Sequence, residues 1–144
     1  MRQLALSDML GTDAAPPSSG LEVYDVFAGA GGFSCGARAA GCKVVFACDV
    51  DQASLEVHQL NHPEATHLCA KLPAELPLPT DGRPFHLHGS PPCTLLSTIN
   101  SVNRVSGDTD KAYDLIHWFL DTALASTATT WSMEQVPEKK VIAL

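Results

Sequence analysis

Short apolar runs rich in β-branched and aromatic residues recur along the chain, and each predicts a strand. The five runs begin near Leu21, Lys43, Ala65, Phe85 and Thr129. Stretches of helical composition lie between them: residues 33–40 form one that ends before Gly41, and another begins near Gln52. Because strands alternate with helices, the pattern predicts an α/β domain with a mostly parallel sheet.

The clearest helix in the pattern covers residues 110–125. Its apolar stripe at helical spacing predicts core packing and consists of Leu115, Ile116, Phe119, Leu120, Ala123 and Leu124. Residues 72–79 contain too many prolines for a helix, so we expect a surface connection there. Residues 100–109 are polar and predict a loop, which either closes over a site or is an ordinary surface loop. Residues 1–20 predict a flexible leader, and residues 21–144 a single domain.

A glycine-rich turn follows the first predicted strand. Residues 25–34 read Asp-Val-Phe-Ala-Gly-Ala-Gly-Gly-Phe-Ser and place Gly29, Gly31 and Gly32 between a strand and a helix. Glycine lets the backbone approach a ligand closely, and a helix N-terminus offers free N–H groups. The turn therefore predicts a nucleotide-type site, although tight turns of this kind also serve packing alone.

The second predicted strand ends in Asp49-Val-Asp51. Asp49 lies about 20 residues beyond the glycines, where dinucleotide-binding folds place the acidic residue that binds a ribose. Both S-adenosylmethionine and NAD contain a ribose, so this spacing does not distinguish the two cofactors. Either aspartate could instead cap the following helix, and Asp51 is the better placed for that role.

The loop after the fourth predicted strand reads Gly-Ser-Pro-Pro-Cys-Thr-Leu-Leu-Ser over residues 89–97. Two prolines restrict the backbone before Cys93, and the carboxyl end of a strand is where open α/β sheets bind ligands. Cys93 is therefore either a nucleophile or a buried packing residue. If it is a nucleophile, we expect it to be the most accessible of the five cysteines.

A third motif, Met-Glu-Gln-Val-Pro, occupies residues 133–137 after the last predicted strand. In a parallel sheet Glu134 would reach the same edge as Cys93. A carboxyl group beside a cysteine suggests a nucleophile with a proton-handling partner. A single glutamate in a loop is otherwise an ordinary solvated charge.

Together these motifs resemble those of the cytosine-C5 DNA methyltransferases, in the same order and spacing. The resemblance implies a Rossmann-like sandwich that uses S-adenosyl-L-methionine and methylates C5 of cytosine in double-stranded DNA. It further implies that Cys93 is the nucleophile, that Glu134 contacts the cytosine ring, and that Ser97 supports the cysteine loop. The cofactor would contact Phe27, Ala28, Gly29, Gly31, Gly32, Asp49 and Val50.

The chain also departs from the family pattern. The stretch corresponding to the family's adenine-binding aspartate is Leu68-Cys-Ala-Lys71, which has no carboxylate, and Glu75 is a weak substitute. Ser90, Leu96 and Gln135 replace residues that are usual in the family. The family's Gln-x-Arg-x-Arg segment and target-recognition domain are not present in this sequence. We therefore expect a C-terminally incomplete catalytic domain.

Three interpretations follow. The chain is a methyltransferase fragment completed by a second subunit, a truncated relative that keeps the cofactor fold without turnover, or, least in keeping with the cysteine loop, an NAD-type nucleotide-binding module. The net charge of −7 is the wrong sign for holding a phosphate backbone, so we expect the isolated chain to bind DNA poorly.

The remaining composition adds exclusions. The cysteines form no C-x-x-C pair, which favours a reducing cytoplasm or nucleus. No signal peptide or membrane span is visible. Two histidine pairs, His58 with His62 and His86 with His88, lack an evident third ligand, so we expect no metal site.

Overall fold

A parallel five-stranded sheet forms the middle layer of the protein, with strand order β3-β2-β1-β4-β5. The computed structural model describes residues 18–93 and 106–137. The strands are β1 (Glu22–Val26), β2 (Lys43–Asp49), β3 (Thr66–Cys69), β4 (Phe85–Gly89) and β5 (Thr130–Met133). The helices are α2 (Gly32–Ala39), α3 (Gln52–Asn61) and α4 (Ser106–Ala125). The predicted α/β fold with a parallel sheet is therefore confirmed.

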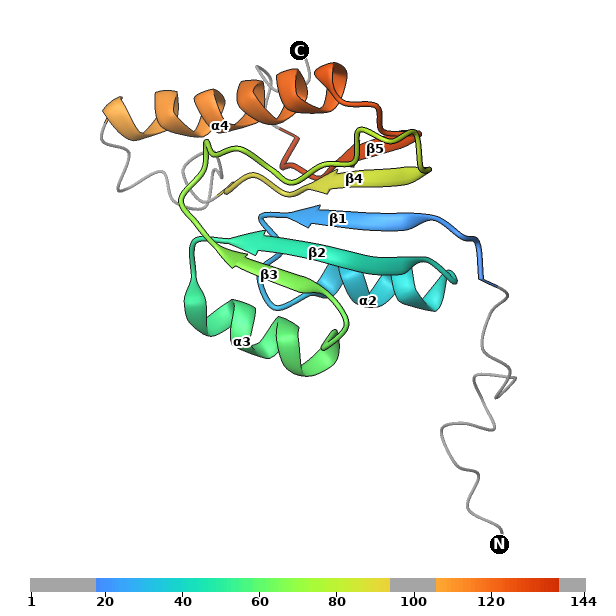
Figure 1. Cartoon of the computed structure of the whole chain (residues 1–144). Coiled ribbons are helices and arrows are strands. Elements are labelled where there is room, and N and C mark those ends of the chain that lie inside the picture. Colours follow the sequence, from blue (N-terminus) through green and yellow to red (C-terminus); the bar gives the residue numbers. More distant parts are fainter. Residues whose placement is uncertain (1–17, 94–105, 138–144) are drawn as a thin grey trace, which may run out of the picture.

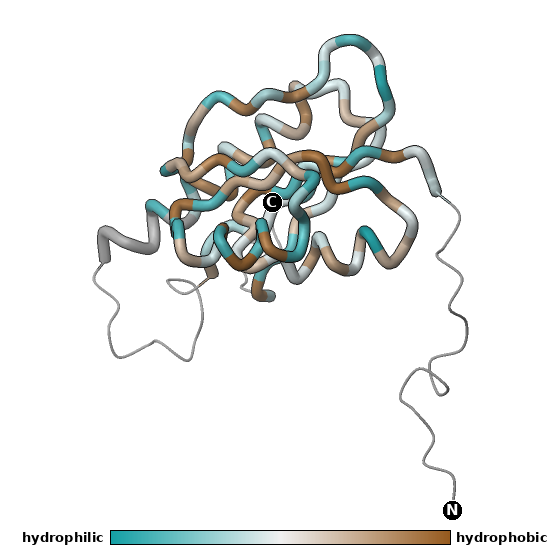
Figure 2. The backbone as a smooth tube through the Cα atoms, turned by 60° about the horizontal axis from the view of Figure 1, so that its bottom comes forward, coloured by the Kyte–Doolittle hydropathy of each residue, from teal (hydrophilic) through white to brown (hydrophobic). Residues whose placement is uncertain are grey.

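The helices cover both faces of the sheet. Figure 1 shows α2 and α3 on one face, under β1, β2 and β3, and α4 on the other face, along β4 and β5. The main core lies on the α4 side and is formed by Tyr24, Val26, Phe46, Cys48, Leu72, Phe85, Leu87, Phe119 and Ala123. In Figure 2 hydrophobic stretches run through the middle of the molecule, and hydrophilic stretches mark the outer loops.

Alternation along the strands separates apolar from polar side chains. Phe85 and Leu87 of β4 belong to the α4-side core, whereas His86 and His88 stack against Phe33 of α2. In β1, Tyr24 belongs to the same core and Asp25 bonds to α2. Successive strand residues point to opposite faces, so the polar members collect on the α2 face.

Two predictions about α4 need correction. The helix begins at Ser106 rather than at residue 110, so part of the predicted loop is helical. Ile116, Phe119 and Ala123 are buried as expected, but Leu124 is 72% exposed. Each helical residue is turned about 100° from the one before it, which takes Leu124 off the face that Ala123 shares with the core.

The connection 72–79 has no regular secondary structure, as predicted, but it is not wholly at the surface. Leu72 and Pro79 are buried, and Leu76 and Leu78 pack against the main core. The predicted leader up to residue 17, Ser97 and residues 100–105 of the predicted loop lie outside the described residues.

The strand order creates a topological switch point at the centre of the sheet. The chain proceeds from β1 outward through β2 to β3, and then crosses to β4 on the other side of β1. At such a point the loops that follow two adjacent strands diverge, leaving room for a ligand at the carboxyl ends. Here those loops are the glycine turn after β1 and the cysteine loop after β4.

Candidate active site

The two loops at the switch point are joined directly. The backbone N–H of Ser90, at the start of the cysteine loop, donates to the carbonyl of Val26, at the end of β1, at 3.1 Å. The glycine turn and the cysteine loop therefore share one rigid base on the central strands.

The glycine turn has the backbone strain expected of a ligand-binding loop. Phe27 has a φ of 62°, unusual for a residue with a side chain, while Gly29 and Gly31 have φ of 52° and 93°. Gly31 is the N-cap of α2, and no side chain caps this helix end. The first N–H groups of α2 thus lack a side-chain acceptor, as a binding site for a polar ligand requires.

Asp49 and Asp51 make different hydrogen bonds, and only Asp51 caps the helix. Asp51 caps α3 by accepting a hydrogen bond from the Ser54 backbone N–H at 3.0 Å, as predicted. Asp49 instead bonds the glycine turn: its Oδ2 accepts from the Gly29 N–H at 2.8 Å, and its Oδ1 accepts from the Asp51 N–H at 2.9 Å. The Asp49 carboxylate is therefore held in one orientation between the turn and the end of β2.

A small apolar pocket of about 180 Å³ lies beside the turn. It is lined by Phe27, Val50, Ala70, Lys71, Leu72, Pro92 and Leu115. The ring of Phe27 packs edge-on against the ring of Trp118, with the ring centroids 6.1 Å apart. Lys71 is the one charged residue of this lining, and no carboxylate belongs to it.

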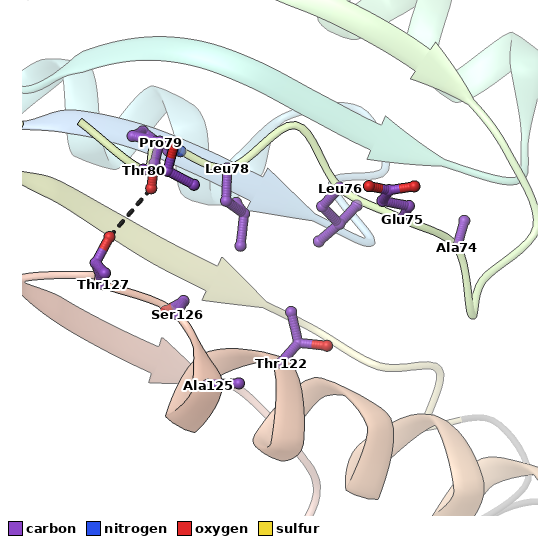
Figure 3. A pocket seen from close by; sticks show the side chains of 10 residues that line it. All are labelled: Ala74, Glu75, Leu76, Leu78, Pro79, Thr80, Thr122, Ala125, Ser126 and Thr127. Carbon is purple, nitrogen blue, oxygen red and sulfur yellow. Dashed lines mark hydrogen bonds between the residues drawn. The ribbon is translucent and has the colours of Figure 1, made fainter. Parts of the chain in front are cut away.

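Glu75 does not line the apolar pocket beside the turn. It lines a separate open pocket between the connection 74–80 and the C-terminal turn of α4, as Figure 3 shows. The two pockets share no residue.

The structure brings the Glu134 segment to the cysteine loop. The Glu134 backbone N–H donates to the carbonyl of Gly89 at 3.0 Å, and the Gln135 side chain donates to the carbonyl of Pro91 at 3.0 Å. Cys93, two residues beyond Pro91, is half-buried, and Glu134 is exposed. Segments distant in sequence thus meet at the carboxyl edge of β4 and β5.

Cys93 is not the most accessible cysteine of the structure. Cys35 and Cys69 are exposed, whereas Cys93 is intermediate and Cys48 is buried. Pro91, two residues before Cys93, is buried.

A histidine–serine network that sequence reasoning missed supports the cysteine loop. His88 Nε2 lies 3.0 Å from the Ser90 hydroxyl, and His88 Nδ1 lies 2.8 Å from the Ser132 hydroxyl. Phe33 stacks on the His88 ring with centroids 3.5 Å apart. Burial, followed by the charge of His86, lowers the pKa of His88 to about 4, so the ring is neutral at pH 7. In the sequence, the signal for this network was the pair of histidines, His86 and His88, at alternate positions of β4.

A second polar network lies under the glycine turn and was also missed. The Ser34 hydroxyl donates to Asp25 Oδ2 at 2.6 Å, and His58 lies 3.1 Å from Ser34 and 2.8 Å from His67. Burial raises the pKa of Asp25 to about 6, against the lowering effect of the Ser34 hydrogen bonds. The signal in the sequence was Asp25, a carboxylate in the middle of the strand between Tyr24 and Val26.

The two histidine pairs lie in hydrogen-bond and stacking networks. Both nitrogens of His58 are engaged, and within residues 18–93 and 106–137 no group of three or more His, Cys, Asp or Glu side chains is arranged to hold a metal ion. In the same described portion of the chain no helix is long and apolar enough to cross a membrane.

The fold and the two joined loops define the class: an α/β domain whose glycine turn and cysteine loop meet at the switch point of a parallel sheet. The sequence profile of the C-5 cytosine-specific DNA methylases matches residues 21–138. The chain therefore belongs to this family, and the resemblance seen in the motifs is confirmed.

A solved structure supports the same assignment. A prophage-encoded protein from E. coli, described as a candidate DNA modification methyltransferase, superposes with a TM-score of 0.66 at 25% identity. The match covers 85% of this chain and 35% of that one, so the chain spans about a third of this neighbour's length. No curated protein matches the chain significantly.

Proposed function

We propose that this chain is the cofactor- and nucleophile-bearing part of a DNA (cytosine-5)-methyltransferase, which transfers a methyl group from S-adenosyl-L-methionine to C5 of cytosine in double-stranded DNA. The observation that carries the proposal is the pair of hydrogen bonds joining the Glu134 segment to the Cys93 loop, beside the glycine turn. Family membership supports the reaction class.

The residues at the glycine turn fit S-adenosyl-L-methionine. The apolar pocket beside Phe27 and Val50 suits a flat aromatic ring such as adenine. The fixed carboxylate of Asp49 has lone pairs left for ribose hydroxyls, and the backbone of Ala28, Gly29, Gly31 and Gly32 would hold the methionine part. When bound, the cofactor supplies an electrophilic methyl group.

The proposed chemistry uses Cys93 as the nucleophile. The target cytosine must leave the base stack, because its ring face is unreachable in a duplex. The Cys93 thiolate adds to C6, while Glu134 contacts N3 and the exocyclic amine and stabilises the ring as charge develops. C5 then forms its bond to the methyl group, and loss of the C5 proton returns the electron pair that expels the thiolate.

Binding of DNA is assigned to other parts of the enzyme. The chain spans about a third of the neighbour and has a net charge of −7, which opposes contact with phosphates. We therefore propose that further segments, or a complementing subunit, supply the DNA-binding surface.

A non-catalytic relative that keeps the cofactor fold is the second candidate. The observation that favours it is Lys71 in the apolar pocket, whose described lining residues include no carboxylate to accept from the adenine amino group. Both candidates require cofactor binding, but only the first requires methyl transfer dependent on Cys93.

Calorimetry on the 144-residue chain tests the cofactor assignment. S-adenosylhomocysteine should bind in preference to NAD, and weakly, because the adenine carboxylate is absent. Asp49→Asn should weaken binding about tenfold or more, since a charged acceptor is lost. Glu75→Gln is the matched control, because Glu75 lines the other pocket, and it should bind like the wild type. Tighter binding of NAD would overturn the assignment.

A further inference from the structure

While Asp25 is ionised, the network under the glycine turn has a single direction of hydrogen donation. The Ser34 hydroxyl has one hydrogen, which it donates to the Asp25 carboxylate. Its oxygen must then accept from His58 Nε2–H, at 3.1 Å. A neutral His58 protonated at Nε2 has a bare Nδ1, which accepts from His67 Nε2–H at 2.8 Å. The result is a one-way chain from His67 through His58 and Ser34 to Asp25.

This chain connects four elements beneath the turn. It begins on β3, passes through α3 and α2, and ends on β1. Its inner members are closed off from solvent: His58 and Ser34 are 0% exposed, and Asp25 is 1% exposed. The His58 ring also touches the turn, because a Cβ placed on Gly31 would lie 2.9 Å from His58 Cδ2.

We propose that His58 is a positioning residue for the glycine turn: by donating to Ser34 and packing under Gly31, it holds the start of α2 in the shape that the cofactor requires. The effect on cofactor rests on the proposed function, whereas the hydrogen-bond chain itself does not. Nothing in the sequence motifs assigns a role to His58, which was considered only as one half of a metal pair.

The groups around the hydrogen-bond chain keep its direction of donation fixed near neutral pH. His58 is faced by His62 at the end of α3, by His67 on β3 and by Glu64 before β3; burial, then the two histidines, lower its pKa to about 4. The His58 ring is therefore neutral, as the hydrogen-bond chain requires.

At the other end, Asp25 is faced by Ser34 on α2 and Asp49 at the end of β2, and His88 is its neighbour on β4. Burial raises the Asp25 pKa to about 6. Above that pH the carboxylate is ionised and accepts strongly. Below it, the carboxyl group is protonated and the chain loses its charged acceptor, so cofactor affinity should fall as the pH decreases through about 6.

Two substitutions separate the bond from the packing. In His58→Gln the amide nitrogen can reach the position of Nε2 and donate to Ser34. In His58→Asn the shorter side chain reaches only the position of Nδ1, so it keeps the contact with His67 and loses the one with Ser34. Both variants remove the ring, and Asn removes one methylene group more than Gln, so the lost packing is similar in kind but larger in His58→Asn.

The test combines calorimetry with S-adenosylhomocysteine and NMR on the 144-residue chain. At about pH 7.5, His58→Asn should weaken binding about tenfold and speed hydrogen exchange at the Gly31 amide, whereas His58→Gln should stay within about threefold of wild type. In the wild type, affinity should fall between about pH 7 and pH 5, and Asp25→Asn should remove that fall. Equal behaviour of the two His58 variants would overturn the positioning role.

Imidazole nitrogen shifts separate failure of this inference from failure of the proposed function. The wild type should show His58 as the neutral Nε2–H tautomer at about pH 7. If the His58 tautomer and the hydrogen exchange of the Gly31 amide behave as stated while no cofactor binds, the proposed function is wrong and the hydrogen-bond chain is confirmed. If His58 carries its proton on Nδ1, the proposed hydrogen-bond chain is wrong, whether or not a ligand binds.

Discussion

Asp25 is a carboxylate within β1, 1% exposed and neighboured by strands on both sides. Its one side-chain donor is Ser34, and its pKa is raised because burial outweighs that hydrogen bond. Ionisation of a buried carboxyl group of this kind lowers the free energy of unfolding, and such a residue is retained where its charge has a function. The chain to His58 supplies such a use.

The pH dependence of stability should show this cost. The unfolded carboxyl titrates near 3.8 and the folded one at about 6, so the folded state holds the proton longer, and stability falls as the pH rises through that window. The loss is about 3 kcal/mol. Chemical denaturation of wild type and Asp25→Asn between about pH 4 and pH 7 measures it. The wild type should lose stability relative to the variant as pH rises; a constant difference would contradict the assignment.

Cysteine reactivity should follow the observed exposure. Iodoacetamide under native conditions should label Cys35 and Cys69 first, Cys93 more slowly, and Cys48 last, since Cys48 is 0% exposed and burial raises its pKa to about 11. Peptide mass mapping over time gives the order. Labelling of Cys48 ahead of Cys93 would show that the core opens or that the cysteine loop is more deeply covered than described.

At the scale of elements, local pattern predicted the strands and α3 well, because alternation and caps are local properties. The Asp51 cap and the start at Gln52 needed only neighbouring residues. The partly buried connection 72–79 did not follow, since its burial depends on contacts with distant residues. The networks through His58 and His88 were missed for the same reason: each joins separate elements.

The contact between β4 and α4 gives a test at this scale. A Cβ at Gly89 would lie 2.3 Å from the Phe119 ring, so Gly89→Ala should destabilise the protein by about 1–3 kcal/mol. Gly36→Ala is the matched control, because no atom lies within 4 Å of its Cβ position, and alanine in a helix should stabilise by up to about 1 kcal/mol. Thermal unfolding compares them. An unchanged melting temperature for Gly89→Ala would contradict the packing.

On the scale of the whole molecule, the sheet has an open edge at β5. Trp131 on that strand is 42% exposed, and the described part of the chain places no strand beyond it. Together with the one-third coverage of the prophage protein, this edge agrees with a catalytic domain that contacts further structure.

The 144-residue chain alone should therefore show no detectable methylation of duplex DNA. Extruding a base costs a few kcal/mol, which DNA contacts must offset, and a chain of net charge −7 offers few. Adding the C-terminal remainder of a family member should restore transfer of labelled methyl groups, and Cys93→Ser should abolish it. Methylation by the unaided chain would contradict this division of roles, and an active Cys93→Ser would contradict the nucleophile.

The most direct test of the central claim is an NMR titration of the chain with S-adenosylhomocysteine, followed at backbone amides. The account predicts saturable shifts at the carboxyl edge, at Gly29, Gly31, Asp49 and Val50, and no such shifts with NAD at the same concentrations. Shifts centred on the pocket that contains Glu75, or no shifts at saturating ligand, would contradict it.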